Sequence, residues 1–388
     1  MTVNIFFCNG PMSAFSSCLI SDYLYREKLD NQFILCIEQG SHVSSAYYEI
    51  VDLIVSQNTR FKKIIRANVE FRVVTKRNLY QFFKNILYYR SISRRIKSQL
   101  ELESIEYDYV LWAPTTSRLW QFFKKRNIRI NVIEHGLGEY ISVLLAQSVS
   151  WKIRLSSFLD RIFWYPNLSI SDSTWLCSHA LPSITQTDKI IVHNFSRQFS
   201  VYANKFWADY QALYPDSASE LNKIASIVRE FPENTYLYLP SDEIRSERQG
   251  DFINAQMKFL GIKPGSTLII KNHPSNIGRR DWEILNSTYN CILIKEELNC
   301  YTPAEFLPII LGLNSVIGSV SSTLFYLRSW MPEIKVFIYN DYDESMLTER
   351  DKGFKRLLKI SGLIVGIPNE SLDVKTVLMD SETHEKNI

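Results

Sequence analysis

Short apolar runs rich in β-branched residues, alternating with helical segments, constrain this chain more than any other feature. A first series of runs lies at residues 3–8, 33–37, 71–75, 107–112 and 128–133. A second series lies at 236–239, 267–271, 291–295, 315–318, 335–339 and 363–365. Continuous apolar runs are typical of buried parallel strands, and strands that alternate with helices predict a doubly wound sheet. The chain is therefore expected to be an α/β protein with two Rossmann-like sheets in sequence.

The length of 388 residues is enough for two domains of ordinary size. Between the two series, residues 141–232 have no clear strand pattern and are expected to be helical or irregular. We expect a first Rossmann-like domain at 1–215, which ends in a helical connector, and a second at 216–388.

Composition narrows the functional class. With 46% hydrophobic and 22% charged residues the chain has the make-up of a globular protein, and a net charge of +3 gives no reason to expect nucleic acid. The six cysteines have no metal-ligand spacing, no secretory signal is apparent, and no apolar run approaches the ~20 residues of a membrane span. We expect a cytoplasmic protein, at most peripheral on the inner face of the membrane.

Basic residues are clustered at 60–76, 90–97 and 352–360. Two interpretations are open. The clusters are either solvated faces or a surface for an anionic partner, such as a charged glycan or membrane phospholipid.

His273 and Pro274 follow directly on the strand expected at 267–271. Proline restricts the preceding residue to an extended conformation, so the direction of the imidazole is largely set. Open α/β sheets bind ligands at the carboxyl edge of their strands. His273 is therefore either a structural strand-end residue or a group that donates to a phosphate oxygen.

Two turns at strand ends in the first half could also carry function. Glu134, His135 and Gly136 follow the strand expected at 128–133, and Asn9 and Gly10 form a sharp turn after the first strand. A glutamate at such an edge can act as a general base, and glycine lets a ligand approach closely. The alternative for Glu134 is a solvated carboxylate in an ordinary turn.

The second half carries hydroxyl and acidic groups between its later strands. Gly318 ends a strand, and Ser321 and Ser322 precede a helix, which suits either a phosphate site or a plain N-cap. Thr302 and Glu305 have the spacing of a capping box, and the alternative for Glu305 is a place near a nucleotide ribose.

These signals together resemble a known family. An acidic residue with glycine after a strand, then His-Pro, then Ser-Ser is the motif order of the bacterial GT-B sialyltransferases, and the chain looks most like the capsular polysialyltransferases. The resemblance implies two Rossmann-like domains that face each other across a cleft. It also implies that the N-terminal domain binds the acceptor and the C-terminal domain binds a CMP-activated donor.

The resemblance further implies inverting transfer of sialic acid, or a related nonulosonic acid, from CMP to a glycan or glycolipid hydroxyl during capsule synthesis. Glu134 would be the general base, and His273 would stabilise the departing phosphate. Pro274 would lie against the nucleotide, and Ser321 and Ser322 would hold the phosphate. No cofactor or metal is expected, because the Asp-x-Asp form of metal-dependent transferases occurs only at 341–343, where an acidic loop is expected.

His135 departs from the family pattern, which has a second acidic residue at this position. Glu134 or Glu139 would then replace that carboxylate, or His135 itself would serve. Two alternatives to sialyl transfer stay open. One is a GT-B transferase that uses CMP-Kdo or a CDP-polyol phosphate, and the other is a non-catalytic nucleotide-sugar binding protein. The basic clusters would suit a polyanionic acceptor.

Overall fold

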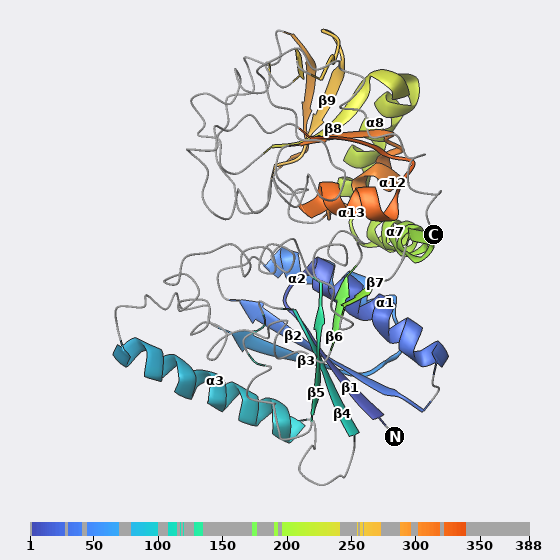
Figure 1. Cartoon of the computed structure of the whole chain (residues 1–388). Coiled ribbons are helices and arrows are strands. Elements are labelled where there is room, and N and C mark those ends of the chain that lie inside the picture. Colours follow the sequence, from blue (N-terminus) through green and yellow to red (C-terminus); the bar gives the residue numbers. More distant parts are fainter. Residues whose placement is uncertain are drawn as a thin grey trace. The chain divides into compact units, whose positions relative to one another are not determined.

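The computed structural model divides into two compact units, each described here by itself (Figure 1). Unit 1 comprises Met1–Leu176 and Leu181–His193, and unit 2 comprises Cys177–Ala180 and Asn194–Ile388. The structure describes residues 2–27, 30–40, 45–69, 79–99, 108–114, 117, 119, 128–134, 173–176, 190–192, 196–240, 254, 257–258, 260–272, 288–295, 302–318 and 322–338.

Unit 1 is built on a parallel sheet of seven described strands in the order β3-β2-β1-β4-β5-β6-β7. The strands are β1 (Thr2–Cys8), β2 (Gln32–Gly40), β3 (Phe61–Val69), β4 (Asp108–Ala113), β5 (Arg129–Ile133), β6 (Ser173–Leu176) and β7 (Ile190–Val192). Its order over the first five strands, with the reversal between β1 and β4, is that of a Rossmann fold.

Helices cover both faces of this sheet. Figure 1 shows α1 (Pro11–Glu27) and α2 (Ser45–Ser56) over one face and α3 (Leu79–Gln99) over the other. Alternate residues of a strand point to opposite faces. Phe7 of β1 accordingly belongs to the core cluster that includes Tyr89 of α3, whereas Phe6 stacks on Trp112 with ring centroids 5.4 Å apart. Burial on both faces explains why inner strands such as β1 and β4 are largely apolar.

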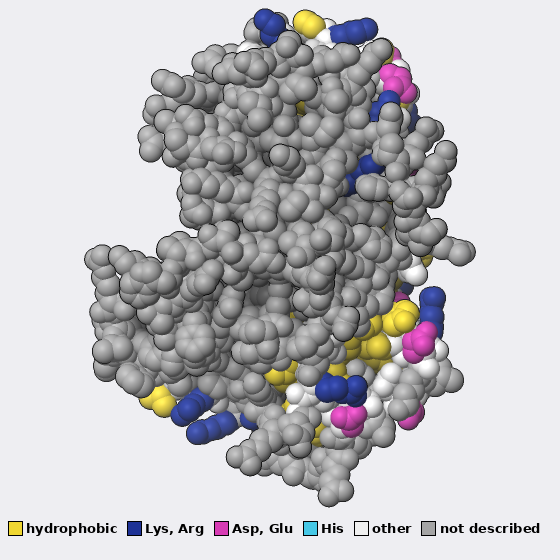
Figure 2. Space-filling view, viewed as in Figure 1, with side chains coloured by type: hydrophobic (Ala, Val, Ile, Leu, Met, Phe, Trp, Pro, Cys, Tyr) yellow, Lys and Arg dark blue, Asp and Glu magenta, His cyan; other side chains and the backbone are white. Residues whose placement is uncertain are grey.

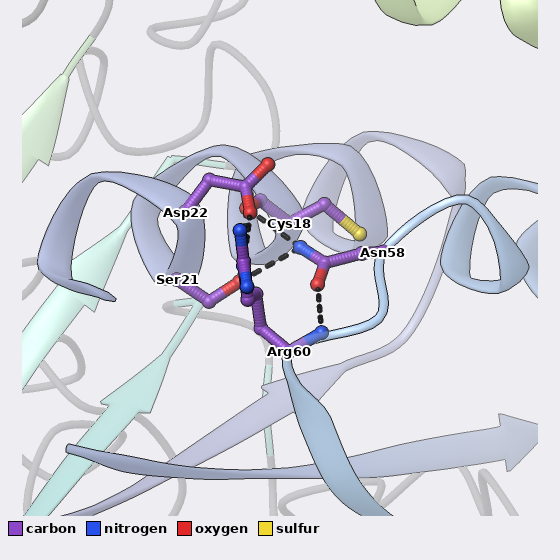
Figure 3. Close-up of polar contacts among 5 residues, drawn as sticks. All are labelled: Cys18, Ser21, Asp22, Asn58 and Arg60. Atoms are coloured by element: carbon purple, nitrogen blue, oxygen red, sulfur yellow. Dashed lines mark hydrogen bonds and ion pairs between the residues drawn. The ribbon is translucent and has the colours of Figure 1, made fainter. Parts of the chain in front are cut away.

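A buried amide ties the amino end of β3 to α1 (Figure 3). The side-chain nitrogen of Asn58 donates to the carbonyl of Cys18 and to the hydroxyl of Ser21, both at 2.9 Å. Its oxygen accepts from the backbone N–H of Arg60 at 2.7 Å. The guanidinium of Arg60 in turn contacts the carboxylate of Asp22 at 3.4 Å. These contacts fix the connection from α2 to β3 against the first helix.

Unit 2 has a parallel sheet of five described strands in the order β10-β9-β8-β11-β12. These are β8 (Thr235–Leu239), β9 (Thr267–Ile270), β10 (Asn290–Leu293), β11 (Ser315–Gly318) and β12 (Lys335–Ile338). The described helices are α7 (Ser196–Leu213), α8 (Pro215–Glu230), α12 (Leu307–Leu311) and α13 (Ser322–Trp330), with a short 3₁₀ turn at Pro232–Asn234. In chain order the strands repeat the Rossmann arrangement of unit 1. Of the described helices in either unit, none is long and apolar enough to cross a membrane.

Helix α7 packs with unit 2, although its residues fall before the domain boundary expected at 215/216. Its ring of Phe199 lies 5.4 Å from that of Phe306 and 4.9 Å from that of Trp330. Phe206, two turns further along α7, lies 5.0 Å from Phe306. The division into units therefore falls near residue 193, because the aromatic face of α7 is buried against α12 and α13.

The strands expected from the apolar runs are present where the structure describes them, but three strands differ from expectation. β3 occupies residues 61–69, whereas the strand expected at 71–75 lies outside the described residues. β6 and β7 lie in the stretch that was expected to be helical or irregular, so that expectation was wrong for these residues. The expected strand at 363–365 also lies outside the described residues.

The described part of the cluster at 60–76 lies at the start and along the length of β3, and the cluster at 90–97 lies on α3. Figure 2 shows Lys and Arg side chains along α3 at the lower left, and Arg90, Arg94 and Arg95 are exposed. On the edge strand β3, Arg66 pairs with Asp52 of α2 at 2.7 Å. Charged residues on an edge strand also discourage pairing with other chains. The third cluster, at 352–360, lies outside the described residues.

Candidate functional site

Both sheets place their candidate residues at the carboxyl edge. In doubly wound sheets ligands bind outside the carboxyl ends of the strands, where the strand order reverses. That point lies between β1 and β4 in unit 1 and between β8 and β11 in unit 2. The sequence-predicted residues can be placed relative to these two points.

The turn after β1 carries Asn9 and Gly10, and its polar groups are used within the turn. The hydroxyl of Ser13 accepts from the backbone N–H of Asn9 at 3.0 Å and of Gly10 at 3.1 Å. A Cβ on Gly10 would overlap the hydroxyl of Tyr47 in α2. Glycine therefore lets the end of the Tyr47 side chain lie close to this turn, and a supporting role of the turn toward the acceptor stays a prediction.

Glu38, near the end of β2, is a buried carboxylate at the carboxyl edge of the first sheet that sequence reasoning missed. Its carboxylate is fully buried, with 0% exposure, and accepts from the hydroxyl of Ser117 at 2.6 Å and from the N–H of Leu119 at 3.3 Å. Burial raises the pKa of the Cys8 thiol to about 12, and the negative charge of Glu38 contributes. The available signal was a carboxylate directly after the apolar run 33–37.

Glu134 lies where the sequence predicted, directly after β5. Its side chain is buried, with 4% exposure of the residue, and its backbone N–H donates to the carbonyl of Trp175 in β6 at 3.2 Å. This bond extends the β5–β6 pairing by one residue and fixes the backbone from which the carboxylate projects. β5 is the strand next to β4, so Glu134 is one strand away from the switch point. His135, Gly136 and Glu139 lie outside the described residues.

In unit 2, β9 leads directly toward the predicted His-Pro motif. The strand ends at Ile270, and Lys271 and Asn272 that follow are both buried. The side-chain oxygen of Asn272 is buried without a hydrogen-bond partner. Buried polar atoms in folded proteins are rarely left unsatisfied, so this oxygen marks a place where a ligand could donate. His273 and Pro274 themselves lie outside the described residues.

Glu305 is engaged with the first turn of α13 and not with a capping box. Its buried carboxylate accepts from the hydroxyl of Thr323 at 2.9 Å. The hydroxyl of Thr302 is buried without a partner, so the predicted box from Thr302 to Glu305 does not form. A carboxylate is favoured at a helix N-terminus, where the backbone N–H groups point outward, which explains why Glu305 reaches α13 instead.

The end of β11 and the start of α13 are packed closely together. A Cβ on Gly318 would lie 2.9 Å from Cδ1 of Leu324 and 3.1 Å from the carbonyl oxygen of Leu239. Glycine at this position therefore lets α13 begin close to the strand edge. Ser322 is the first residue of α13, one position earlier than the expected helix start near Thr323, and Ser321 lies outside the described residues.

Within the described ranges, no group of three or more His, Cys, Asp and Glu side chains is arranged to hold a metal ion. Asp341 and Asp343 lie outside these ranges.

The model of one protein family covers most of the chain. The family described as Alpha-2,8-polysialyltransferase (POLYST) matches residues 4–340. The chain belongs to the alpha-2,8-polysialyltransferase family. This polysialyltransferase family member is accordingly a glycosyltransferase, and sialic acid transfer is the activity that its family indicates. No curated protein sequence is significantly similar to it.

Solved structures establish the fold of this polysialyltransferase family member. The GT-B domain of a sialyltransferase from Photobacterium damselae is 13% identical, with a TM-score of 0.52 over 95% of this chain and 99% of that chain. A further structure of a Photobacterium damsela sialyltransferase is 12% identical, with a TM-score of 0.54 and coverages of 94% and 81%. A UGT transferase from Siraitia grosvenorii in complex with UDP is 11% identical, with a TM-score of 0.53 and coverages of 97% and 90%. The two Rossmann-like halves are those of a GT-B glycosyltransferase.

Proposed function

We propose that the protein transfers sialic acid, or a related nonulosonic acid, from a CMP donor to a sugar hydroxyl, with inversion and without a metal. An acceptor oxygen attacks the anomeric carbon, the bond from that carbon to the CMP phosphate oxygen breaks, and CMP leaves. Glu134 takes the proton of the attacking hydroxyl. His273 hydrogen-bonds or protonates the departing phosphate, so charge that develops on the leaving group is stabilised.

The observation that carries this proposal is the carboxyl edge of the second sheet. Two polar atoms are buried there without partners, namely the side-chain oxygens of Asn272 and Thr302, with residue exposures of 6% and 3%. The carboxylate of Glu305 lies on the first turn of α13, which Ser322 opens. Buried polar atoms without partners suit a nucleotide, whose base and ribose can donate to them, and the N-terminus of a helix suits its phosphate.

In this proposal the second unit binds the donor. Ser321 and Ser322 hold the phosphate, Pro274 lies against the nucleotide, and Glu305, which is bonded to the first turn of α13, contacts the ribose. Gly318 contributes by letting α13 start close to β11. The first unit binds the acceptor, a glycan or glycolipid of the bacterial capsule or cell surface that can be polyanionic. The protein would act at the inner face of the cytoplasmic membrane as a peripheral protein.

A donor panel tests the proposal. CMP release and product formation are measured with CMP-sialic acid, CMP-Kdo and a CDP-polyol phosphate, each with sialylated and galactosyl acceptors. We expect turnover with CMP-sialic acid alone. Turnover only with CMP-Kdo or with the CDP-polyol phosphate would show that this compound, and not CMP-sialic acid, is the donor. Absence of both hydrolysis and transfer of CMP-sialic acid would overturn the proposal.

A further inference from the structure

The carboxylate of Glu38 connects two strands that are not neighbours in the first sheet. Glu38 lies on β2, and its partners Ser117 and Leu119 follow β4. β1 lies between these two strands. The bonds of 2.6 Å to the Ser117 hydroxyl and 3.3 Å to the Leu119 N–H therefore pass over the carboxyl end of β1. That is the point where the strand order reverses and where a ligand of this unit is expected.

One partner of Glu38 is bonded back to the end of β4. The backbone N–H of Ser117 donates to the carbonyl of Pro114 at 3.0 Å, and Pro114 directly follows β4. Ser117 and Leu119 are both fully buried, and both donate to Glu38. Glu38 thereby determines where these two residues lie beside the switch point.

A stabilising role alone does not explain a carboxylate at this place. Removing a carboxylate from water is costly, and apolar residues of similar volume often serve the stability of a core equally well. An ionised acceptor, in contrast, makes stronger and more directional hydrogen bonds than a neutral one. Directional contacts are what a segment needs when its position matters more than its packing.

We propose that Glu38 is a positioning residue for acceptor binding. It holds Ser117 and Leu119 in place after the end of β4, and so fixes one side of the acceptor site between the switch point and the strand that carries Glu134. The inference rests on the proposed function, in which the first unit binds the acceptor. It predicts that loss of Glu38 affects acceptor affinity and leaves donor affinity unchanged.

The test compares Glu38→Ala, Glu38→Gln and Ser117→Ala with the matched control Asn58→Ala. Asn58 is also a buried polar tie in unit 1, but it lies before the amino end of β3, at the opposite edge of the sheet. For Glu38→Ala we expect an acceptor KM about tenfold higher, the equivalent of one charged hydrogen bond. The KM for the donor and kcat at saturating acceptor should stay within about twofold.

The other variants define the outcome. Glu38→Gln keeps an oxygen that can accept from Ser117, so it should recover a large part of the acceptor affinity, and Ser117→Ala should lose part of it. Asn58→Ala should lower the unfolding midpoint without changing the acceptor KM. If Glu38→Ala and Asn58→Ala lose stability alike and neither changes the acceptor KM, Glu38 is only structural and the inference is overturned.

A second readout does not depend on activity. Hydrogen exchange at the backbone N–H of Leu119 should be faster in Glu38→Ala than in wild type, and unchanged in Asn58→Ala. Unchanged exchange in Glu38→Ala would contradict the inference even if the donor panel succeeds. If exchange is faster in Glu38→Ala but the wild type transfers no sialic acid, the proposed function is wrong, whereas the contact made by Glu38 is confirmed.

Discussion

Glu305 and Thr323 form one buried hydrogen bond in the second unit, with 2.9 Å between the carboxylate and the hydroxyl oxygen. The bond connects the segment before α12 with the first turn of α13, directly after Ser322. Because Ser322 in this turn is a proposed phosphate ligand, the proposal makes the position of the donor phosphate depend on a contact made by Glu305.

Removing the Thr323 hydroxyl should therefore weaken both stability and donor binding. Thr323→Val keeps the shape and leaves a buried carboxylate without this donor, which should lower the free energy of unfolding by about 1–3 kcal/mol. The affinity for CMP, measured by calorimetry, should fall as well. Thr323→Ser keeps the hydroxyl and serves as control. Equal CMP affinity in Thr323→Val and Thr323→Ser would show that the bond between Glu305 and Thr323 does not affect donor binding.

Ser322 and Ser329 lie near opposite ends of α13, so Ser329→Ala can serve as the control for Ser322→Ala. Ser329 donates to the carbonyl of Phe325 at 3.0 Å, within the helix. Loss of one hydroxyl contact to a phosphate should weaken CMP binding by roughly tenfold in Ser322→Ala, with a smaller effect on kcat. Ser329→Ala should bind CMP as the wild type does. Unchanged CMP affinity in Ser322→Ala would show that Ser322 only begins the helix and does not contact the phosphate.

The close approach of Tyr47 to Gly10 predicts that a second substitution, at Tyr47, partly restores the stability lost in Gly10→Ala. A methyl group on Gly10 would overlap the Tyr47 hydroxyl, so Gly10→Ala should cost about 1–3 kcal/mol of unfolding free energy. Tyr47→Phe removes that hydroxyl, so the double variant should lose less stability than the sum of the single variants. Urea unfolding of all four proteins gives the coupling energy. Additive losses would show that something other than this contact determines the glycine.

The buried thiols of unit 1 should make stability fall at alkaline pH. Burial raises the pKa of Cys8 to about 12 and also raises that of Cys36, whereas a thiol in the unfolded chain titrates near pH 8.5. Above about pH 8.5 the unfolded state loses protons that the folded state keeps, so stability declines as the pH rises toward 12. Urea midpoints at pH 8 and pH 10 should differ less in Cys8→Ala than in wild type. An identical difference would contradict the raised pKa of Cys8.

Much of the fold follows from the sequence because parallel strands buried on both faces leave continuous apolar runs. The strands β1, β4, β5, β8, β9 and β11 are of this kind. β3 is an edge strand whose exposed positions carry Lys62, Lys63 and Arg66, so its pattern is interrupted by charge and no strand was predicted there. β6 and β7 have only four and three residues, too few for a periodic signal.

The candidate site was predictable only in part. Residues at the end of an apolar run, such as Glu134, could be located because the strand itself identifies the edge. Contacts between distant segments leave no comparable pattern. Glu38 meets Ser117 across 79 positions of the chain, and Glu305 meets Thr323 instead of its close neighbour Thr302. The boundary near residue 193 depends on the aromatic face of α7, whose partners lie a hundred residues or more further along.

Glu134 as the base that activates the acceptor is the central claim, and the rate of sialyl transfer from the CMP donor tests it most directly. The measurement compares wild type with Glu134→Gln and with Glu230→Gln, an exposed control on α8. We predict that Glu134→Gln lowers kcat by at least about a hundredfold while CMP affinity stays unchanged, and that Glu230→Gln behaves as the wild type. Full turnover in Glu134→Gln, or a loss confined to donor binding, would contradict the account.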